Sequence, residues 1–177
     1  MVTKVYGTTG VDRIVDGAIT SSDFASSAIT GNILPAGSTL QVVNGTTSTQ
    51  VSANSSTWVD TTLSATITPS STSSKILVIV QQNGCGKTTG DVTLQLRLLK
   101  DSTTLFEFES AGGWTGSGAT NLFGTCGTAY LDSPSTTSAV TYKTQMTAFS
   151  PSSIVYTQFN VGSGTPTSTI TLMEIAG

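Results

Sequence analysis

The stretch SATITPSSTSSKILVIVQQNG, residues 64–84, decides the fold of this chain. Ala65 and Ile67 alternate with polar residues, and the pattern then stops at Pro69 and the polar turn SSTSS. Lys75–Gln82 is apolar on both faces, as is typical of a strand in the middle of a sandwich. The stretch therefore predicts a strand, a turn and a central strand.

A similar strand signal closes the chain as TSTITLMEIAG, residues 167–177. Because it runs to the last residues, we expect the fold to end there, with no further domain. The segment VTLQLRL, residues 92–98, alternates apolar and polar side chains, which predicts a half-buried strand that forms a hairpin with Leu105–Glu109. The remaining expected strands are Leu40–Asn44, Trp58–Thr68, Leu122–Leu131, Val140–Phe149, Ile154–Phe159 and Ser168–Ile175.

Eight or nine strands separated by turn clusters, with no convincing helix, predict an all-β fold. Two packed antiparallel sheets, a β-sandwich of jelly-roll kind, are the natural arrangement. The 177 residues fit one domain of this type with an arm. We therefore expect an extended N-terminal arm at residues 1–38 and the β-sandwich at residues 39–177.

The composition is typical of durable structural proteins. Charged residues make up 10% of the chain, against roughly 25% in ordinary soluble domains. Ser and Thr supply about a third of the residues, so solubility depends on hydroxyl groups more than on ions. Fibres, shells and adhesins need such surfaces, which stay folded and unaggregated for a long time.

Charge and hydropathy exclude several partners. The net charge is −3, and the seven Lys and Arg residues are spread singly, whereas a nucleic-acid binder clusters them against phosphates. The longest purely apolar run, Ile76–Val80, is far shorter than the roughly 20 residues of a membrane span. The N-terminus has no apolar core of a signal peptide. We expect neither nucleic-acid binding nor membrane insertion, with synthesis in the cytoplasm and release by lysis.

The arm carries short apolar bursts separated by Gly, Ser and Asp, none long enough for a stable element. Such a segment has too few contacts to fold alone, so we expect it to wrap onto its own domain, a sister chain or a larger assembly. Its candidate interaction residues are Val11, Ile14, Val15, Ile19, Phe24 and Ile29.

Few residues are suited to catalysis or metal binding. The chain has no histidine, which removes Ser-His-Asp and Cys-His catalysis. Cys85 and Cys126 are too few for a disulfide scaffold, and a reduced, partly buried pair is favoured over a disulfide. Two cysteines without histidine cannot supply four zinc ligands. We expect no cofactor, no metal and no enzymatic activity.

Two motifs that suggest chemistry have simpler interpretations. GCGKTTG, residues 84–90, resembles a phosphate-binding loop, but Gln81 stands where the first glycine belongs and a strand pattern follows where a helix is needed. We interpret it as a solvent-exposed loop. Glu107 and Glu109 are neighbours on one strand, whereas glycosidase carboxylates flank a sugar from two sides. An exposed strand face is favoured over a hydrolase pair or a calcium site.

The two tryptophans have different expected roles. Trp114 lies in the glycine-rich loop SAGGWTGSGATN, residues 110–121. It is a candidate contact residue for a sister subunit, a capsid or a sugar, because tryptophan supplies a large area at low entropic cost. The alternative is a lid folded over the end of the sandwich. Trp58 opens a strand and is expected in the core.

Four segments share a pattern of strand, turn and strand: TWVDTTLSATITPSSTSSKILVIVQQNG, RLLKDSTTLF, YLDSPSTTSAVTYKTQ and STITLMEIAG. Together they resemble a recurring C-terminal β-sandwich module in virion surface proteins of tailed bacteriophages, especially cyanobacterial and marine phages. The arm, GVDRIVDGAITSSDFASSAITGNIL, is similar to the connector that precedes such modules in fibre proteins. The resemblance implies a homotrimeric β-sandwich on the virion surface.

The short arm separates this chain from fibres, which carry a long shaft before the tip. We therefore expect a capsid decoration (cement) protein whose arm binds the major capsid protein. The alternative is a short tail fibre or receptor-binding tip that joins a tail component and contacts host surface glycans. An esterase or glycanase is the least supported class.

Overall fold

The structure, a computed structural model, describes residues 34–116, 121–150, 153–160, 162 and 164–177. The chain separates into two compact units, Met1–Leu34 and Pro35–Gly177. The predicted arm residues from Val11 to Ile29 lie outside the described residues, so their role stays a prediction. No helix in the described part is long and apolar enough to cross a membrane.

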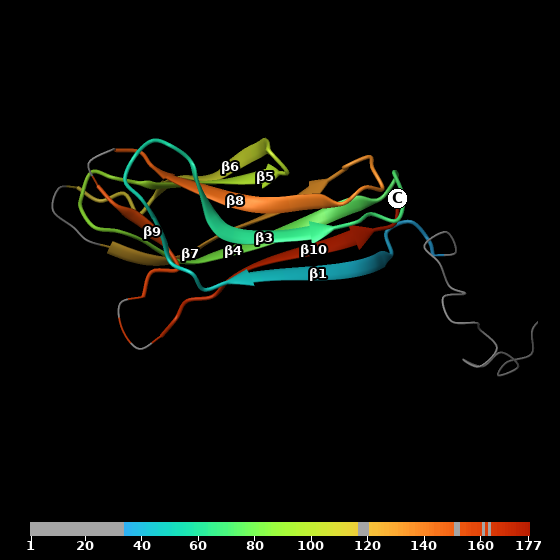
Figure 1. Cartoon of the computed structure of the whole chain (residues 1–177), viewed down its shortest axis with the longest axis horizontal. Helices are drawn as coiled ribbons and strands as arrows, with labels where there is room; N and C mark the ends of the chain where they lie inside the picture. The colour runs from blue at the N-terminus through green and yellow to red at the C-terminus, as the bar shows by residue number, and fades with distance from the viewer. Residues whose placement is uncertain (1–33, 117–120, 151–152, 161, 163) are drawn as a thin grey trace, which may run out of the picture. The chain divides into compact units, whose positions relative to one another are not determined.

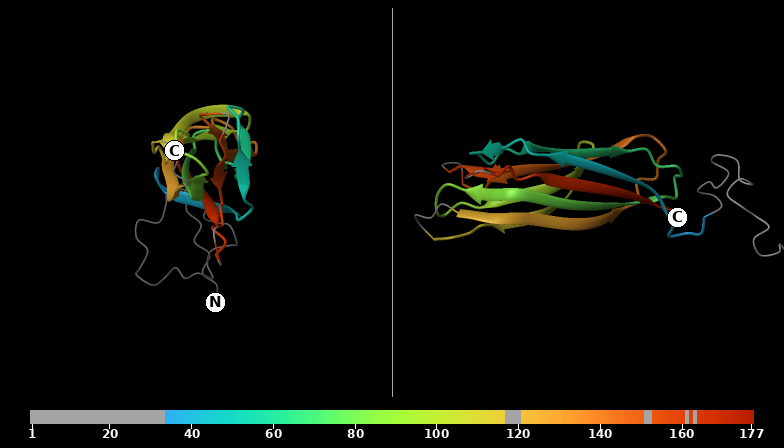
Figure 2. Two further views of the ribbon diagram at one scale, coloured as in Figure 1. Left: turned by 90° about the vertical axis from the view of Figure 1, so that its left-hand side faces the viewer. Right: turned by 90° about the horizontal axis from the view of Figure 1, so that it is seen from below.

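The second unit is a sandwich of two antiparallel sheets (Figure 1). The first sheet places four long strands side by side (Figure 2, right) and adds two three-residue strands, β2 and β9, at one end. In spatial order, its first three strands are β1 (Thr39–Thr47), β10 (Ser168–Ile175) and β4 (Lys75–Lys87). On the far side of β4, β7 (Asn121–Asp132) pairs with it along most of its length. The end of β4 also pairs with β9 (Val155–Thr157), which in turn pairs with β2 (Val51–Ala53).

The second sheet packs against the first and contains the hairpin predicted from residues 92–109. Its strands, in spatial order, are β3 (Val59–Ile67), β8 (Val140–Ala148), β5 (Leu94–Lys100) and β6 (Thr103–Gly112). If the eight long strands are numbered along the chain, the sheet orders are 1-8-3-6 and 2-7-4-5. This is the double-sheet arrangement of a jelly roll, so the predicted fold class is confirmed.

The strand predictions were close, with two corrections. The part of the chain that the structure describes has ten strands rather than eight or nine, because the sequence pattern did not indicate β2. β4 continues to Lys87, five residues beyond the predicted end, and lies between β10 and β7 as a central strand should.

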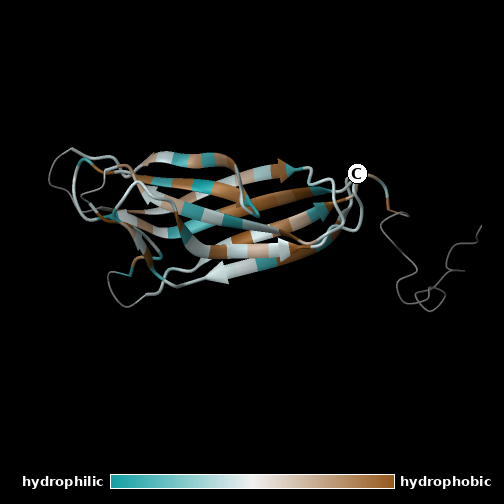
Figure 3. Cartoon of the chain, turned by 45° about the horizontal axis from the view of Figure 1, so that its top comes forward, coloured by the Kyte–Doolittle hydropathy of each residue, from teal (hydrophilic) through white to brown (hydrophobic). Residues whose placement is uncertain are grey.

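Alternation of side chains builds the interior. On β3 every second residue from Thr61 to Ile67 is buried, and hydrophilic and hydrophobic bands alternate along the strands in Figure 3. The core contains two apolar clusters, one around Leu63, Val78 and Leu172 and one around Leu94, Met146 and Val155. Burial of these side chains, at about 25 cal/mol per Å², is the main favourable term in folding.

A buried polar belt lies where the two clusters meet, with Thr144 between Tyr142 and Met146 on β8. The Thr144 hydroxyl donates to Gln82 Oε1 at 2.8 Å, and Gln82 Nε2 donates to Ser168 Oγ at 3.3 Å. Thr61 from β3 joins the belt through the Thr144 hydroxyl. Because the belt links both sheets and its groups satisfy one another, it fixes their alignment while avoiding the cost of unpaired buried groups.

The edge formed by β1 and β3 is tightly closed. At Gly45 a Cβ atom would lie 2.1 Å from the carbonyl oxygen of Ser64. Only glycine permits this approach of β1 to β3.

Candidate interaction site

The sandwich has two distinct ends. At the terminal end, Gly37 N donates to the carbonyl of Ala176 at 2.7 Å and Ala176 N donates to the carbonyl of Ser38 at 2.8 Å. The segment before β1 and the C-terminus therefore lie together there, where β4 begins. The opposite end, where β4 finishes at Lys87, is called the loop end below.

An aromatic hollow lies at the loop end. Its volume is about 220 Å³, and its lining includes Trp114, Phe149, Gln95 and Ser110. Trp114 is 59% exposed and Phe149 is 66% exposed. Two large rings beside amide, hydroxyl and backbone groups suit a contact with a neutral polar partner, since the rings supply area and the polar groups supply hydrogen bonds. The structure thus places the predicted contact residue Trp114 at the surface; Phe149 was missed as its neighbour.

Backbone hydrogen bonds fix the chain at both aromatic residues. Trp114 N donates to the carbonyl of Ala111 at 3.2 Å, which closes a turn directly after β6, and Phe149 N donates to the carbonyl of Thr93 at 3.1 Å. A backbone anchored in this way limits the space that the two side chains can reach, so less backbone freedom is lost when a partner binds.

Residues 88–90 of the GCGKTTG motif lie outside the strands, but its first half is not the solvent-exposed loop we expected. Gly84–Lys87 belong to β4, and Lys87 is 1% exposed. Its Nζ donates to Thr115 Oγ1 at 2.6 Å and to the carbonyl of Val92 at 3.3 Å. These acceptors satisfy the buried ammonium and tie β4 to the loop that carries Trp114. The lysine therefore has a structural role there.

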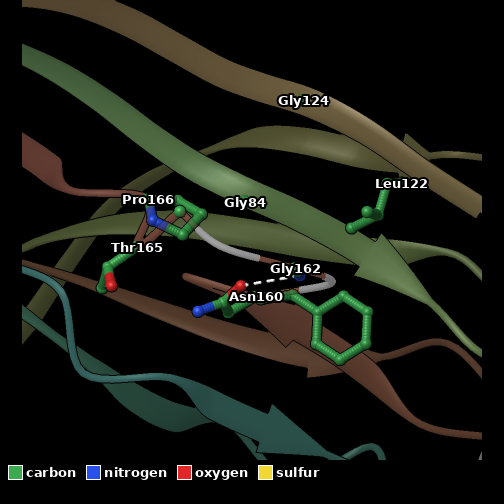
Figure 4. A pocket seen from close by; sticks show the side chains of 9 residues that line it. Gly84, Leu122, Gly124, Asn160, Gly162, Thr165 and Pro166 are labelled. Carbon is green, nitrogen blue, oxygen red and sulfur yellow. Dashed lines mark hydrogen bonds between the residues drawn. The ribbon is translucent and has the colours of Figure 1, made fainter.

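A larger hollow of about 530 Å³ lies beside the same end (Figure 4). Leu122, Phe159 and Pro166 supply its apolar walls, and Gly84 and Gly124 bring backbone into its lining. None of the described residues that line this hollow has a titratable side chain.

The cysteines are both free and buried, as the sequence predicted for a reduced pair. The neighbouring Cys126 sulfur, together with burial, raises the pKa of the Cys85 thiol. The Cys85 thiol donates to the carbonyl of Gln82 at 3.1 Å. A protonated, buried thiol is a poor nucleophile.

The paired glutamates form no joint site. Glu109 Oε1 accepts the amide of Ala111 at 3.0 Å, and Glu107 lies opposite Arg97 in the β5–β6 hairpin. Among the described residues, no group of three His, Cys, Asp or Glu side chains could hold a metal ion.

Other ionisable side chains stabilise the sandwich. The Tyr142 hydroxyl donates to Asp132 Oδ2 at 2.7 Å, and Lys100 Nζ lies 2.9 Å from the same oxygen. Burial first, and then the Asp132 carboxylate, raise the pKa of Tyr142 above its usual value. These three residues link β7 of one sheet to β5 and β8 of the other.

Trp58 corrects a further prediction, because it is not in the core. It is half-buried just before β3, and the guanidinium carbon of Arg97 lies 4.3 Å from its ring centroid. The cation–π contact holds the ring on the outer surface of the second sheet. Sequence pattern alone gave no signal of Arg97, which lies on a different strand.

Comparison with protein-family models gives no match for this chain, and comparison with curated protein sequences gives none either.

Proposed function

We propose that this chain is a non-enzymatic structural protein of a tailed-bacteriophage virion. In this proposal it is a homotrimeric capsid decoration (cement) protein, made in the host cytoplasm, released by lysis and located on the virion surface. The arm, residues 1–38, binds the major capsid protein. The protein stabilises the shell by burying surface area between capsid subunits, and it makes or breaks no covalent bond.

The observation that carries this proposal is the difference between the two ends of the sandwich. The chain enters the sandwich at Pro35 on the terminal end, beside Ala176, whereas the exposed rings of Trp114 and Phe149 are at the loop end. A protein with this layout can attach by one end and present the other to solvent. The jelly roll supports the proposal as a fold that recurs in viral capsid domains, although a fold by itself specifies no function.

Interior chemistry also supports a structural role. The buried Lys87, Tyr142 and Gln82 are bonded to protein groups that tie strands and loops together. The free thiols are buried. Polar groups committed to such networks stabilise a fold but present no reactive atom to a substrate.

Binding to capsids that lack their decoration protein tests the proposal. The purified full-length chain should bind them, and removal of residues 1–30 should abolish binding while the trimer persists. Trp114→Ala, at the opposite end of the sandwich, is the matched control and should bind normally. The number of copies in a virion separates the locations, since hundreds indicate decoration and a few tens or fewer indicate a tail part. Loss of capsid binding in the control but not in the truncated chain would overturn the proposal.

A short tail fibre or receptor-binding tip is the second candidate, and the aromatic hollow favours it. Exposed rings beside Gln95 and Ser110 suit the apolar face and hydroxyl groups of a surface glycan. On this alternative, the chain binds host cells and blocks phage adsorption, and Trp114→Ala with Phe149→Ala removes both effects. Normal adsorption in the presence of excess protein excludes it.

A further inference from the structure

An apolar row crosses the outer face of the first sheet. The strand registers place Val42 of β1 opposite Met173 of β10, Met173 opposite Leu77 of β4, and Leu77 opposite Leu131 of β7. All four strands thus contribute one large apolar side chain to a single line. These side chains point away from the core, since their strand neighbours point inward.

The row is open to solvent at both of its ends. Val42 is 57% exposed at one edge of the sheet, and Leu131 is 50% exposed at the other. Met173 and Leu77 are half-buried between them. Ile79, 37% exposed, extends the patch on the neighbouring row. Contiguous exposed apolar surface of this kind marks an interaction site.

The outer face of the second sheet has the opposite character. There the aligned residues of β3, β8, β5 and β6 are Asp60, Gln145, Arg97 and Glu107. Gln145 Nε2 donates to Asp60 Oδ1 at 2.6 Å, and Arg97 Nε donates to Gln145 Oε1 at 3.0 Å. A charged, hydrogen-bonded ladder suits a face in contact with water.

The first sheet is nearly free of charge on its outer face. Among the described residues that its four long strands direct outward, Lys75 carries the one charge, at the margin beside Ile175. Copies of this face can therefore approach without like charges meeting at the centre. A strongly charged partner would find nothing to pair with there.

The size of the row identifies the kind of partner. A single extended segment laid along the row would cover a strip about 5 Å wide and would leave the neighbouring rows, which include the exposed Ile79, uncovered. With strands about 4.8 Å apart and rows about 6.8 Å apart, four strands and four rows cover about 500 Å². Three copies that each bury this face against the other two remove about 1,500 Å² from water in all, above the roughly 1,000 Å² that a specific interface needs.

We propose that the outer face of β1–β10–β4–β7 binds other copies of this chain: in the trimer the three faces turn toward a common threefold axis, and each face contacts both neighbours. The inference rests on the proposed function for the number of copies, but the face itself is assigned from the registers and exposures above. The face of the second sheet remains in solvent.

The test compares two pairs of lysine substitutions. Val42→Lys with Leu131→Lys puts two charges into the row, where both side chains are already half in water, so the fold is retained. An unpaired charge in a desolvated contact should raise the dissociation constant of the assembly by roughly a hundredfold or more. Thr66→Lys with Thr104→Lys, at exposed sites on β3 and β6, adds the same charge elsewhere and should leave the assembly intact.

Light scattering at micromolar concentration reads the result, and circular dichroism with the urea midpoint checks each fold. A trimeric wild type and a monomeric row variant support the assignment. A row variant that stays trimeric overturns the assigned face and leaves the proposed trimer standing. A dimeric wild type that the row variant splits supports the face and overturns the trimer. A monomeric wild type overturns both.

Labelling of a single cysteine gives a second readout that does not depend on dissociation. Leu131→Cys should react with a maleimide at least about tenfold more slowly in the assembly than in dilute, dissociated protein, because the partner covers it. Thr66→Cys should react at one rate under both conditions. The native thiols are buried and add little background. Equal rates for Leu131→Cys under both conditions contradict the inference.

Discussion

Replacement of Glu174 by glutamine, which has nearly the same shape, should strongly destabilise the sandwich. The side chain is buried on β10. Glu174 Oε2 accepts Gln41 Nε2 at 2.6 Å, and Oε1 accepts Ser70 N at 2.6 Å and Ser70 Oγ at 2.7 Å. The carboxylate thus fastens β1 and the turn before β4 to the last strand.

The magnitude follows from counting these bonds. A glutamine keeps one acceptor oxygen, which can serve Ser70, but its amide nitrogen then faces Gln41 Nε2, donor against donor. Gln41 cannot turn its amide over freely, because the same Nε2 also donates to the carbonyl of Thr68 at 2.8 Å. One charge-assisted bond is worth about 1.5–3 kcal/mol, and the two retained bonds weaken to neutral ones. We expect the free energy of unfolding to fall by about 3 kcal/mol at pH 7.

The same substitution predicts a pH dependence. Burial alone would raise the pKa of Glu174, but the hydrogen bonds from Gln41 and Ser70 outweigh it and lower the pKa below the ordinary value of 4.5. A lowered folded-state pKa stabilises the fold above the unfolded pKa, and this stability disappears as the pH falls through the folded pKa. The difference between wild type and Glu174→Gln should therefore be largest near pH 7 and shrink below about pH 4.

Urea unfolding at pH 7 and pH 3 measures both effects. Glu107→Gln, at an exposed carboxylate on β6, is the matched control and should change the free energy of unfolding by less than about 0.5 kcal/mol. An equal effect of both substitutions at pH 7, or a Glu174→Gln effect that stays constant down to pH 3, would refute the reasoning.

Three further predictions concern other buried groups. Tyr142→Phe should lower the free energy of unfolding by about 2 kcal/mol, because a hydrogen bond to a charged acceptor is lost. The ultraviolet titration of the folded protein should not change up to pH 11, because the raised pKa keeps Tyr142 protonated there. Gly84→Ala should lower the free energy of unfolding in urea by more than about 2 kcal/mol, because φ is +61° and the new Cβ would lie 2.6 Å from a backbone nitrogen. Gly116→Ala, with open space around the new Cβ, should lower it by less than about 1 kcal/mol. The two cysteines should react with a disulfide reagent only after denaturant is added, and immediate reaction of the native protein would contradict their burial.

Strand positions were predictable because alternation is a local property. The pattern of residues 92–98 and the apolar run Ile76–Val80 identified strands from a few neighbouring side chains. The end of β4 was not predictable, because glycines near residue 84 signal a turn. Pairing with β7 and β9 keeps that segment in the sheet, and β-bulges absorb the irregularity after Gln82.

The candidate surfaces depended on contacts between distant strands. Trp114 was identified because a tryptophan among glycines is unusual, but nothing local indicates Phe149 beside it. The apolar row joins Val42 to Met173 across 131 positions, and only the register places both on one line. The position of Trp58 outside the core was not predictable for the same reason, because its cation–π partner, Arg97, lies on another strand.

The mass of the purified chain in solution tests the central claim most directly, namely that this sandwich works by assembling with itself. The chain has a mass of 18.1 kDa. Light scattering at micromolar concentration should give three times that value, and Val42→Lys with Leu131→Lys should return it to one. A wild-type mass of a single chain would contradict the account.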